Sequence, residues 1–138
     1  MKTDDLNLDA FETVQTGDMA VRNPETGAPT TARITLAGPE HPTHRRILLD
    51  KARRMRASMM KNGKVQLDDP EDDEAAETDL LVACTLGWSG ISRGGKPLAY
   101  SADEARKLYT DPGRRWLRDQ VRTYLADAQS FIKRSGNN

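Results

Sequence analysis

The spacing of apolar residues changes near residue 42, and this change limits the chain to a fold that combines strands with helices. Before it, apolar and polar residues alternate in two short runs, residues 19–22 and 28–36. Alternation is typical of a strand with one buried face, and the turn residues between the runs, 23–27, predict a β-hairpin. After residue 42, apolar residues recur at helical spacing. The sequence therefore predicts an α+β fold.

The predicted hairpin is expected to expose its strand edges. Pro29, at the start of the second strand, cannot donate a ladder hydrogen bond and does not suit a central strand. A lone hairpin is only marginally stable in water, and a chain with 36% hydrophobic residues has a thin core. We therefore expect the hairpin to pack on the helices or on another copy of the chain, so a homo-oligomer is among the expected assemblies.

About four helices are predicted to follow the hairpin. The first covers residues 43–62, and the second, with an Asp-Pro start, covers residues 69–87. A short third helix begins at Ser101, which forms a capping box with Glu104: the serine hydroxyl accepts from one free amide and the glutamate carboxylate from another. The fourth covers residues 111–131, where apolar residues recur at steps of three and four.

A length of 138 residues predicts a single small domain. We expect this domain to span residues 19–133, between a flexible arm at residues 1–18, with at most one short strand, and a disordered tail at residues 134–138. No apolar run approaches the length of a membrane span, and residues 1–10 lack the basic and then apolar order of a signal peptide. The expected location is the cytoplasm, without membrane contact.

Acids and bases are segregated along the chain although they balance in total. Residues 41–64 hold eight bases against Asp50 alone, and residues 65–79 hold eight acids and no base. The basic block could bind nucleic acid or an acidic partner. Alternatively it is a solvated helix face that lies near the acidic block, whose counter-charge would weaken the field that a polyanion needs, so nucleic-acid binding is not favoured.

Methionines on the first predicted helix are the candidates for binding a client protein. Because the unbranched thioether adapts to varied shapes, methionines beside arginines can form a pliable partner surface. The other interpretation is that they fill the core. The candidate client-binding residues are Arg53, Met55, Arg56, Met59 and Met60.

No arrangement of residues supports catalysis, a cofactor or a metal. His41 and His44 have the spacing of two ligands on one helical face, but no third ligand is near, and both are expected at the exposed start of the first helix. Cys84 is the single cysteine and is expected to be a buried small apolar residue. The glycine-rich residues 92–97 lack the spacing of a phosphate loop and are expected to form a turn.

The second half of the chain resembles the small tail assembly chaperones of long-tailed, siphovirus-like bacteriophages. The resemblance rests on a tryptophan, a glycine-proline turn, a serine-capped short helix, a proline-started last helix and a final phenylalanine, and the hairpin before a basic helix is similar to the N-terminal half of such proteins. It covers about residues 19–133. The structural anchors are Trp88, Tyr100, Ser101, Trp116 and Phe131.

The resemblance implies a non-enzymatic protein of virion morphogenesis. Such a chaperone binds the tape-measure protein, keeps its long apolar helices soluble in the host cytoplasm, brings tail-tube subunits to it, and is absent from the mature virion. Members of the family are often also made as a longer product by ribosomal frameshifting. No extension able to recruit tube subunits is recognised in this sequence. The alternative is a nucleic-acid-associated regulator that uses the basic helix 43–62; an enzyme is the third and least favoured class.

Overall fold

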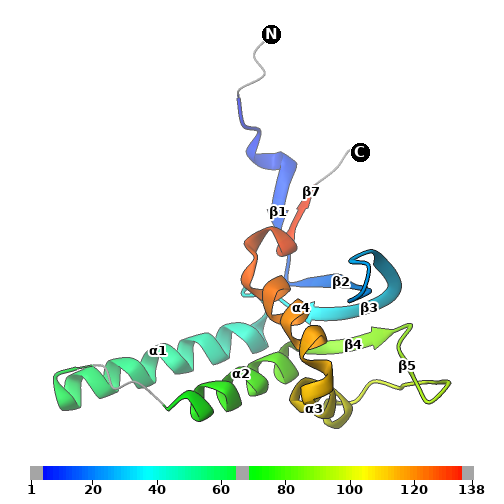
Figure 1. Ribbon diagram of the computed structural model, residues 1–138. Helices are drawn as coiled ribbons and strands as arrows, with labels where there is room; N and C mark the ends of the chain where they lie inside the picture. Colours follow the sequence, from blue (N-terminus) through cyan, green and yellow to red (C-terminus); the bar gives the residue numbers. More distant parts are fainter. Residues whose placement is uncertain (1–4, 65–68, 135–138) are drawn as a thin grey trace.

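A three-stranded antiparallel sheet organises the chain in a computed structural model that describes residues 5–64 and 69–134 (Figure 1). Strands β2 (Thr16–Arg22) and β3 (Pro29–Ala37) form the predicted hairpin, with Met19 opposite Ile34. The carboxamide oxygen of Asn23 accepts hydrogen bonds from two amides of the turn, and Gly27 takes a φ of 77°. The hairpin prediction is confirmed. The turn forms at these residues because asparagine can bond the turn amides and glycine can take a positive φ.

The third strand, β4 (Thr85–Ser89), corrects the prediction that the second helix continues to residue 87. Helix α2 (Pro70–Cys84) ends earlier, and the chain passes directly into β4, where Trp88 pairs with Ile34 of β3. Thr85 holds the junction: its hydroxyl donates to the Leu81 carbonyl at 2.8 Å. Because β4 covers the outer edge of β3, the hairpin is less exposed than the sequence predicted.

The core forms where the sheet meets α2, α3 and α4. Helix α3 spans Ala102–Thr110 and α4 spans Arg115–Ala126, whereas α1 (Pro42–Asn62) runs beside α2 and extends away from the sheet (Figure 1). Four helices together with the sheet give the α+β class that the sequence predicted. The largest fully buried side chains are those of Tyr109, Phe131, Ile34, Leu36, Leu81, Val121, Thr85 and Cys84.

The fourth predicted helix is divided in three. A 3-10 turn (Pro112–Arg114) leads into α4, and a second 3-10 turn (Ala128–Phe131) follows it. Phe131 is buried with its ring edge-to-face against Tyr124, at 5.4 Å between centroids. Ala128, which the helical spacing placed on the apolar side, is exposed. Ala128 is therefore the exception among the apolar residues that the spacing placed together, because α4 ends before it.

The two ends of the described chain come together in a separate two-stranded sheet. Strand β1 (Phe11–Thr13) pairs antiparallel with β7 (Ile132–Arg134). The predicted flexible arm at residues 1–18 therefore contains a 3-10 turn (Leu8–Ala10), strand β1 and the start of β2. The predicted disordered tail at residues 134–138 begins one residue too early, because Arg134 belongs to β7. Residues 1–4, 65–68 and 135–138 lie outside the described residues. Two short strands, β5 (Ser92–Arg93) and β6 (Lys96–Pro97), enclose the predicted glycine-rich turn.

Replacing Gly38 by Ala tests the contact between the end of β3 and the buried Phe131. A β-carbon at Gly38 would lie 2.5, 2.6 and 2.9 Å from three ring atoms of Phe131. We expect the free energy of unfolding to fall by about 1–3 kcal/mol, the usual cost of overpacking a core. The measurement is urea unfolding. The control is Gly87→Ala, where a β-carbon meets nothing within 4 Å; equal losses in the two variants would contradict the assignment.

Candidate functional site

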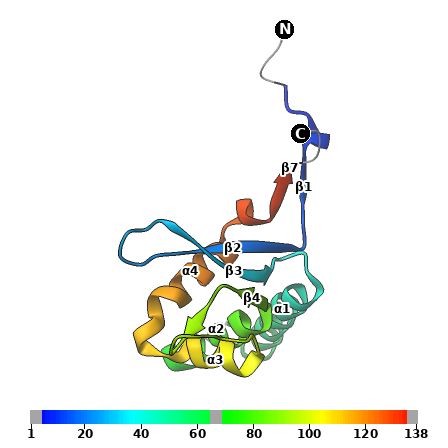
Figure 2. The same ribbon diagram turned by 90° about the vertical axis from the view of Figure 1, so that its right-hand side faces the viewer.

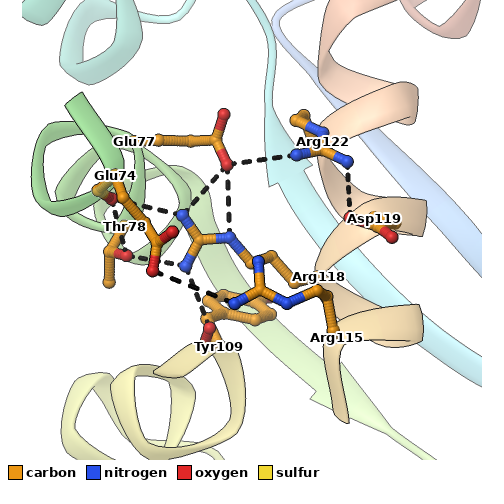
Figure 3. A network of polar contacts seen from close by, with 8 residues as sticks. All are labelled: Glu74, Glu77, Thr78, Tyr109, Arg115, Arg118, Asp119 and Arg122. Atoms are coloured by element: carbon orange, nitrogen blue, oxygen red, sulfur yellow. Dashed lines mark hydrogen bonds and ion pairs between the residues drawn. The ribbon is translucent and has the colours of Figure 1, made fainter. Parts of the chain in front are cut away.

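Among the residues that the structure describes, the guanidinium of Arg118, on α4, makes the most side-chain hydrogen bonds. Its side chain is 3% exposed and reaches into the space between α2 and α3 (Figure 3). Nε and Nη2 donate to the Glu77 carboxylate at 3.2 and 2.9 Å, and Nη2 also donates to the Glu74 carbonyl at 3.2 Å. Nη1 donates to the Thr78 hydroxyl at 2.7 Å and to the Tyr109 carbonyl at 2.9 Å.

These bonds use all five donors that a guanidinium has. Burying a charge is costly unless it is paired and hydrogen-bonded, and here both conditions are met inside the chain. No donor remains for a ligand or a substrate. Arg118 is therefore a structural group that joins α2, the end of α3 and α4.

Around Arg118, the acids of α2 form ion pairs with α3 and α4. The Glu77 carboxylate is also 3.5 Å from Arg122, and Glu74 is 3.9 Å from Arg115 (Figure 3). Asp79 forms a further ion pair, with Arg106 of α3, at 3.0 Å. Within the described residues, no ion pair joins α2 to α1. Helix α1 nevertheless runs beside α2 and its bases are exposed, so the basic block is a solvated helix face near the acidic block.

Two buried acidic groups, the Cys84 thiol and the Tyr109 phenol, are held in their neutral forms. Burial raises the pKa of Cys84 to about 12. Burial also raises the pKa of Tyr109 to about 12, against the opposing effect of its 2.8 Å hydrogen bond with the Thr85 hydroxyl. Cys84 is buried, as predicted, and the protonated thiol is a poor nucleophile at neutral pH.

The two histidines have different structural roles. His41 caps α1, its Nδ1 accepting a hydrogen bond from the Thr43 amide at 3.2 Å. His44 is buried and donates from Nδ1 to the Ala37 carbonyl at 2.8 Å, so the prediction that both histidines are exposed is wrong for His44. In residues 5–64 and 69–134, no three His, Cys, Asp or Glu side chains come together as a metal site.

The predicted anchors contact different parts of the fold. The rings of Trp88 and Tyr100 meet edge-to-face at 5.1 Å; the indole donates to the Leu98 carbonyl at 2.7 Å and the phenol to the Thr85 carbonyl at 2.6 Å. The Ser101 hydroxyl accepts from the Glu104 amide at 3.0 Å and caps α3. Trp116 is 37% exposed, so unlike Phe131 it lies at the surface.

Helix α1 is the candidate binding surface, because its apolar side chains are not used by the core. Of its 21 residues only His44 is buried. The candidate methionines are all exposed, Met55 by 45%, Met59 by 47% and Met60 by 81%. Leu48 and Leu49 are exposed as well and belong to the same surface, although the sequence did not distinguish them from core residues.

The large exposed apolar residues of α1 lie in two adjacent rows, since side chains three and four positions apart lie on one face of a helix. The first row is apolar, and the second has two basic side chains between two apolar ones. Arg53 of the second row pairs with Asp50 of its own helix, at 2.9 Å. The apolar row is Leu48, Ala52, Met55 and Met59, and the mixed row is Leu49, Arg53, Arg56 and Met60.

Comparisons with known proteins identify no relative of this chain. Neither the family models, nor the curated proteins, nor the solved structures contain a match. Among the helices of the described residues, none has both the length and the apolar character needed to cross a membrane.

Replacing Arg118 by Lys should destabilise the protein although the charge is kept. An ammonium has three donors in place of five, so it leaves a buried oxygen without a partner. We expect the free energy of unfolding to fall by about 2–4 kcal/mol, measured by urea unfolding. The control is Arg115→Lys: this arginine is half-exposed and pairs with Glu74 at 3.9 Å, so a change within about 0.5 kcal/mol is expected. A tolerated Arg118→Lys would contradict the structural role.

Cys84 should resist thiol reagents until the protein unfolds. At pH 8 the folded thiol is protonated, because its pKa is raised to about 12, and it is buried. We expect Ellman's reagent to label it slowly in native buffer and at once in urea. Since unfolding restores the ordinary pKa of 9.0, folding stability should also fall as the pH rises above that value. Equal labelling rates in the two solutions would show that the site is open.

Proposed function

We propose that this protein is a tail assembly chaperone of a long-tailed bacteriophage that binds the tape-measure protein along α1 and keeps it soluble. The observation that carries the proposal is the exposed apolar row of α1, formed by side chains that a folded domain normally buries. An exposed apolar surface with polar rims is typical of a site for protein interaction. The sequence resemblance supplies the identity of the client.

The client that best fits this surface is a long amphipathic helix. Helix α1 has 21 residues and is therefore roughly 30 Å long, enough to lie along several turns of another helix. Methionine side chains adjust to clients of varied sequence, because the thioether is flexible and polarizable. A protein that must hold many successive stretches of one long client benefits from such a surface.

The mixed row of α1 adds a charge requirement. Arg53 and Arg56 flank the apolar row, and Arg56 has no ion-pair partner in the described part of the chain. A client helix with acids beside its apolar stripe would pair with these arginines, which favours one orientation of binding more than it adds affinity.

The chemistry of the buried groups supports a binding protein. Arg118 has no free donor, and Cys84 and Tyr109 are neutral near pH 7 because of their raised pKa values. We therefore propose that the protein acts without an enzymatic step. From the resemblance we further propose that it acts in the host cytoplasm and is absent from the mature virion. Contact with tail-tube subunits rests on the resemblance alone, because no extension able to recruit them is recognised in this sequence.

A nucleic-acid-associated regulator is the second candidate, and one observation favours it. Several bases of α1 have no acidic partner within residues 5–64 and 69–134, among them Arg46, Lys51, Arg54 and Arg56. Binding to phosphates loses affinity steeply as salt rises, whereas an apolar client contact does not. Titrating salt against binding distinguishes the two functions.

Replacing Met55 and Met59 by Gln tests the client site without adding charge or breaking the helix. We expect the soluble yield of a co-expressed tape-measure protein to fall and its affinity to drop by at least about tenfold, because two buried methionines contribute about 1.5–3 kcal/mol each. The measurement is pull-down followed by titration with the purified client fragment. The melting temperature should hardly change, since exposed substitutions alter stability by about 0.5 kcal/mol or less.

The matched control changes Lys51 and Arg54 to Gln. These exposed residues lie on another row of α1, which also contains Ile47 and Ser58. This variant should keep full client capture. Loss of capture in the control, together with a steep salt dependence, would favour the nucleic-acid candidate; unfolding of the methionine variant would place these residues in a core.

A further inference from the structure

The β1–β7 sheet, residues 11–13 and 132–134, is a ribbon with two open edges. It points away from helices α1, α2 and α3 in both views (Figures 1 and 2). Phe11 pairs with Arg134, and Thr13 pairs with Ile132. In the described residues neither strand has a second neighbouring strand.

The direction of the unused backbone groups follows from the ladder. The Val14 amide donates to the Phe131 carbonyl at 2.7 Å, next to the paired residues. In an antiparallel ladder, bonded and non-bonded pairs alternate, so Glu12 and Lys133 exchange the next bonds within the ribbon. The N–H and C=O groups of Phe11 and Thr13 on β1 therefore face outward, as do the C=O of Ile132 and the backbone groups of Arg134 on β7. The Ile132 amide is already used, since it donates to the Gln129 carbonyl.

The ribbon also exposes apolar side chains on one face. Phe11 is 48% exposed and Ile132 is 46% exposed. They share a face, because successive side chains of a strand point to opposite sides and both belong to the non-bonded pairs. Exposed edges with apolar side chains are a template for pairing with another strand.

The charges on the two edges decide which strand can be added. Strand β1 carries Glu12, and β7 carries Lys133 and Arg134; in the part of the chain that the structure describes, none of the three is in an ion pair. Pairing β1 with β1, or β7 with β7, would oppose like charges, which destabilises a sheet. Pairing β1 with β7 opposes unlike charges.

The geometry points to a second copy of this chain as the occupant: β1 of one copy adds to β7 of the next and continues the antiparallel ladder across the contact. Each Glu12 then lies between two basic strands. The contact is heterologous, since it joins two different edges, so each copy keeps one edge for a further copy and the assembly closes into a ring or grows as a chain. This inference concerns a surface other than α1 and does not depend on the proposed client.

The contact is small, which sets the expected behaviour. Each added strand has three residues, so a single contact is weak and assembly should depend on concentration. Added salt should weaken it, because the opposed charges are exposed and are screened.

Thr13→Pro tests the edge directly. Proline removes the outward amide of β1 and blocks an approaching strand, while the bonds that Glu12 and Val14 make within the ribbon are kept. We expect wild-type protein to increase in mass with concentration by sedimentation velocity, and Thr13→Pro to raise the dissociation constant by at least about tenfold. The control, Thr13→Val, keeps the amide and the strand propensity and should assemble as the wild type does.

Three outcomes would overturn the inference: wild-type protein that stays monomeric at all concentrations, assembly of Thr13→Pro equal to that of the wild type, or loss of assembly in the Met55, Met59 glutamine variant with the edge variant unaffected. The last outcome would place the self-contact on α1. Client capture by Thr13→Pro, measured in parallel, separates a failure of the ribbon contact from a failure of the proposed function. Equal melting temperatures for the proline and valine variants show that the domain is folded.

Discussion

The buried guanidinium of Arg118 determines how the helices of this domain can be arranged. A charge removed from water must have its hydrogen bonds replaced, and the replacements come from the carboxylate of Glu77, the hydroxyl of Thr78 and the carbonyls of Glu74 and Tyr109. Because these oxygens belong to two helices, moving either one leaves buried oxygens without a donor. The constraint fixes α2 and α3 against α4, and α4 in turn packs on β2, where the Gln120 side chain bonds both backbone groups of Arg22.

Helix α1 lies outside this constraint, and the sequence could not show it. Its apolar residues have the same helical spacing as a core-facing stripe, and spacing alone does not say whether another layer covers the face. The structure buries only His44 at its first turn, so the candidate residues from Arg53 to Met60 are exposed. The sequence analysis also missed the burial of Arg118, because a charged residue is normally expected at the surface. Its position three residues before Val121 nevertheless places it on the buried face of α4.

Local signals predicted the hairpin, the four helices and the serine cap of α3, because each depends on neighbouring residues. The features that the sequence did not predict depend on distant ones. Strand β4 follows α2 without an intervening turn residue, so no signal marks the change at Thr85, and its strand geometry comes from pairing with β3. Strands β1 and β7 have three residues each and pair across nearly the whole chain, and no periodicity is visible in so short a segment.

The two proposed surfaces extend in different directions from the domain (Figure 1), and this separation has a consequence for binding a long client. Joining copies through β1 and β7 leaves every α1 accessible, so an assembly presents several weak apolar sites at once. Linked sites raise the local concentration for each further contact, and overall affinity can exceed that of one site by about 10²–10⁴ when the geometry permits. A chaperone built this way would hold a long helical protein firmly through many contacts, and each single contact would remain weak enough to release when the tail assembles.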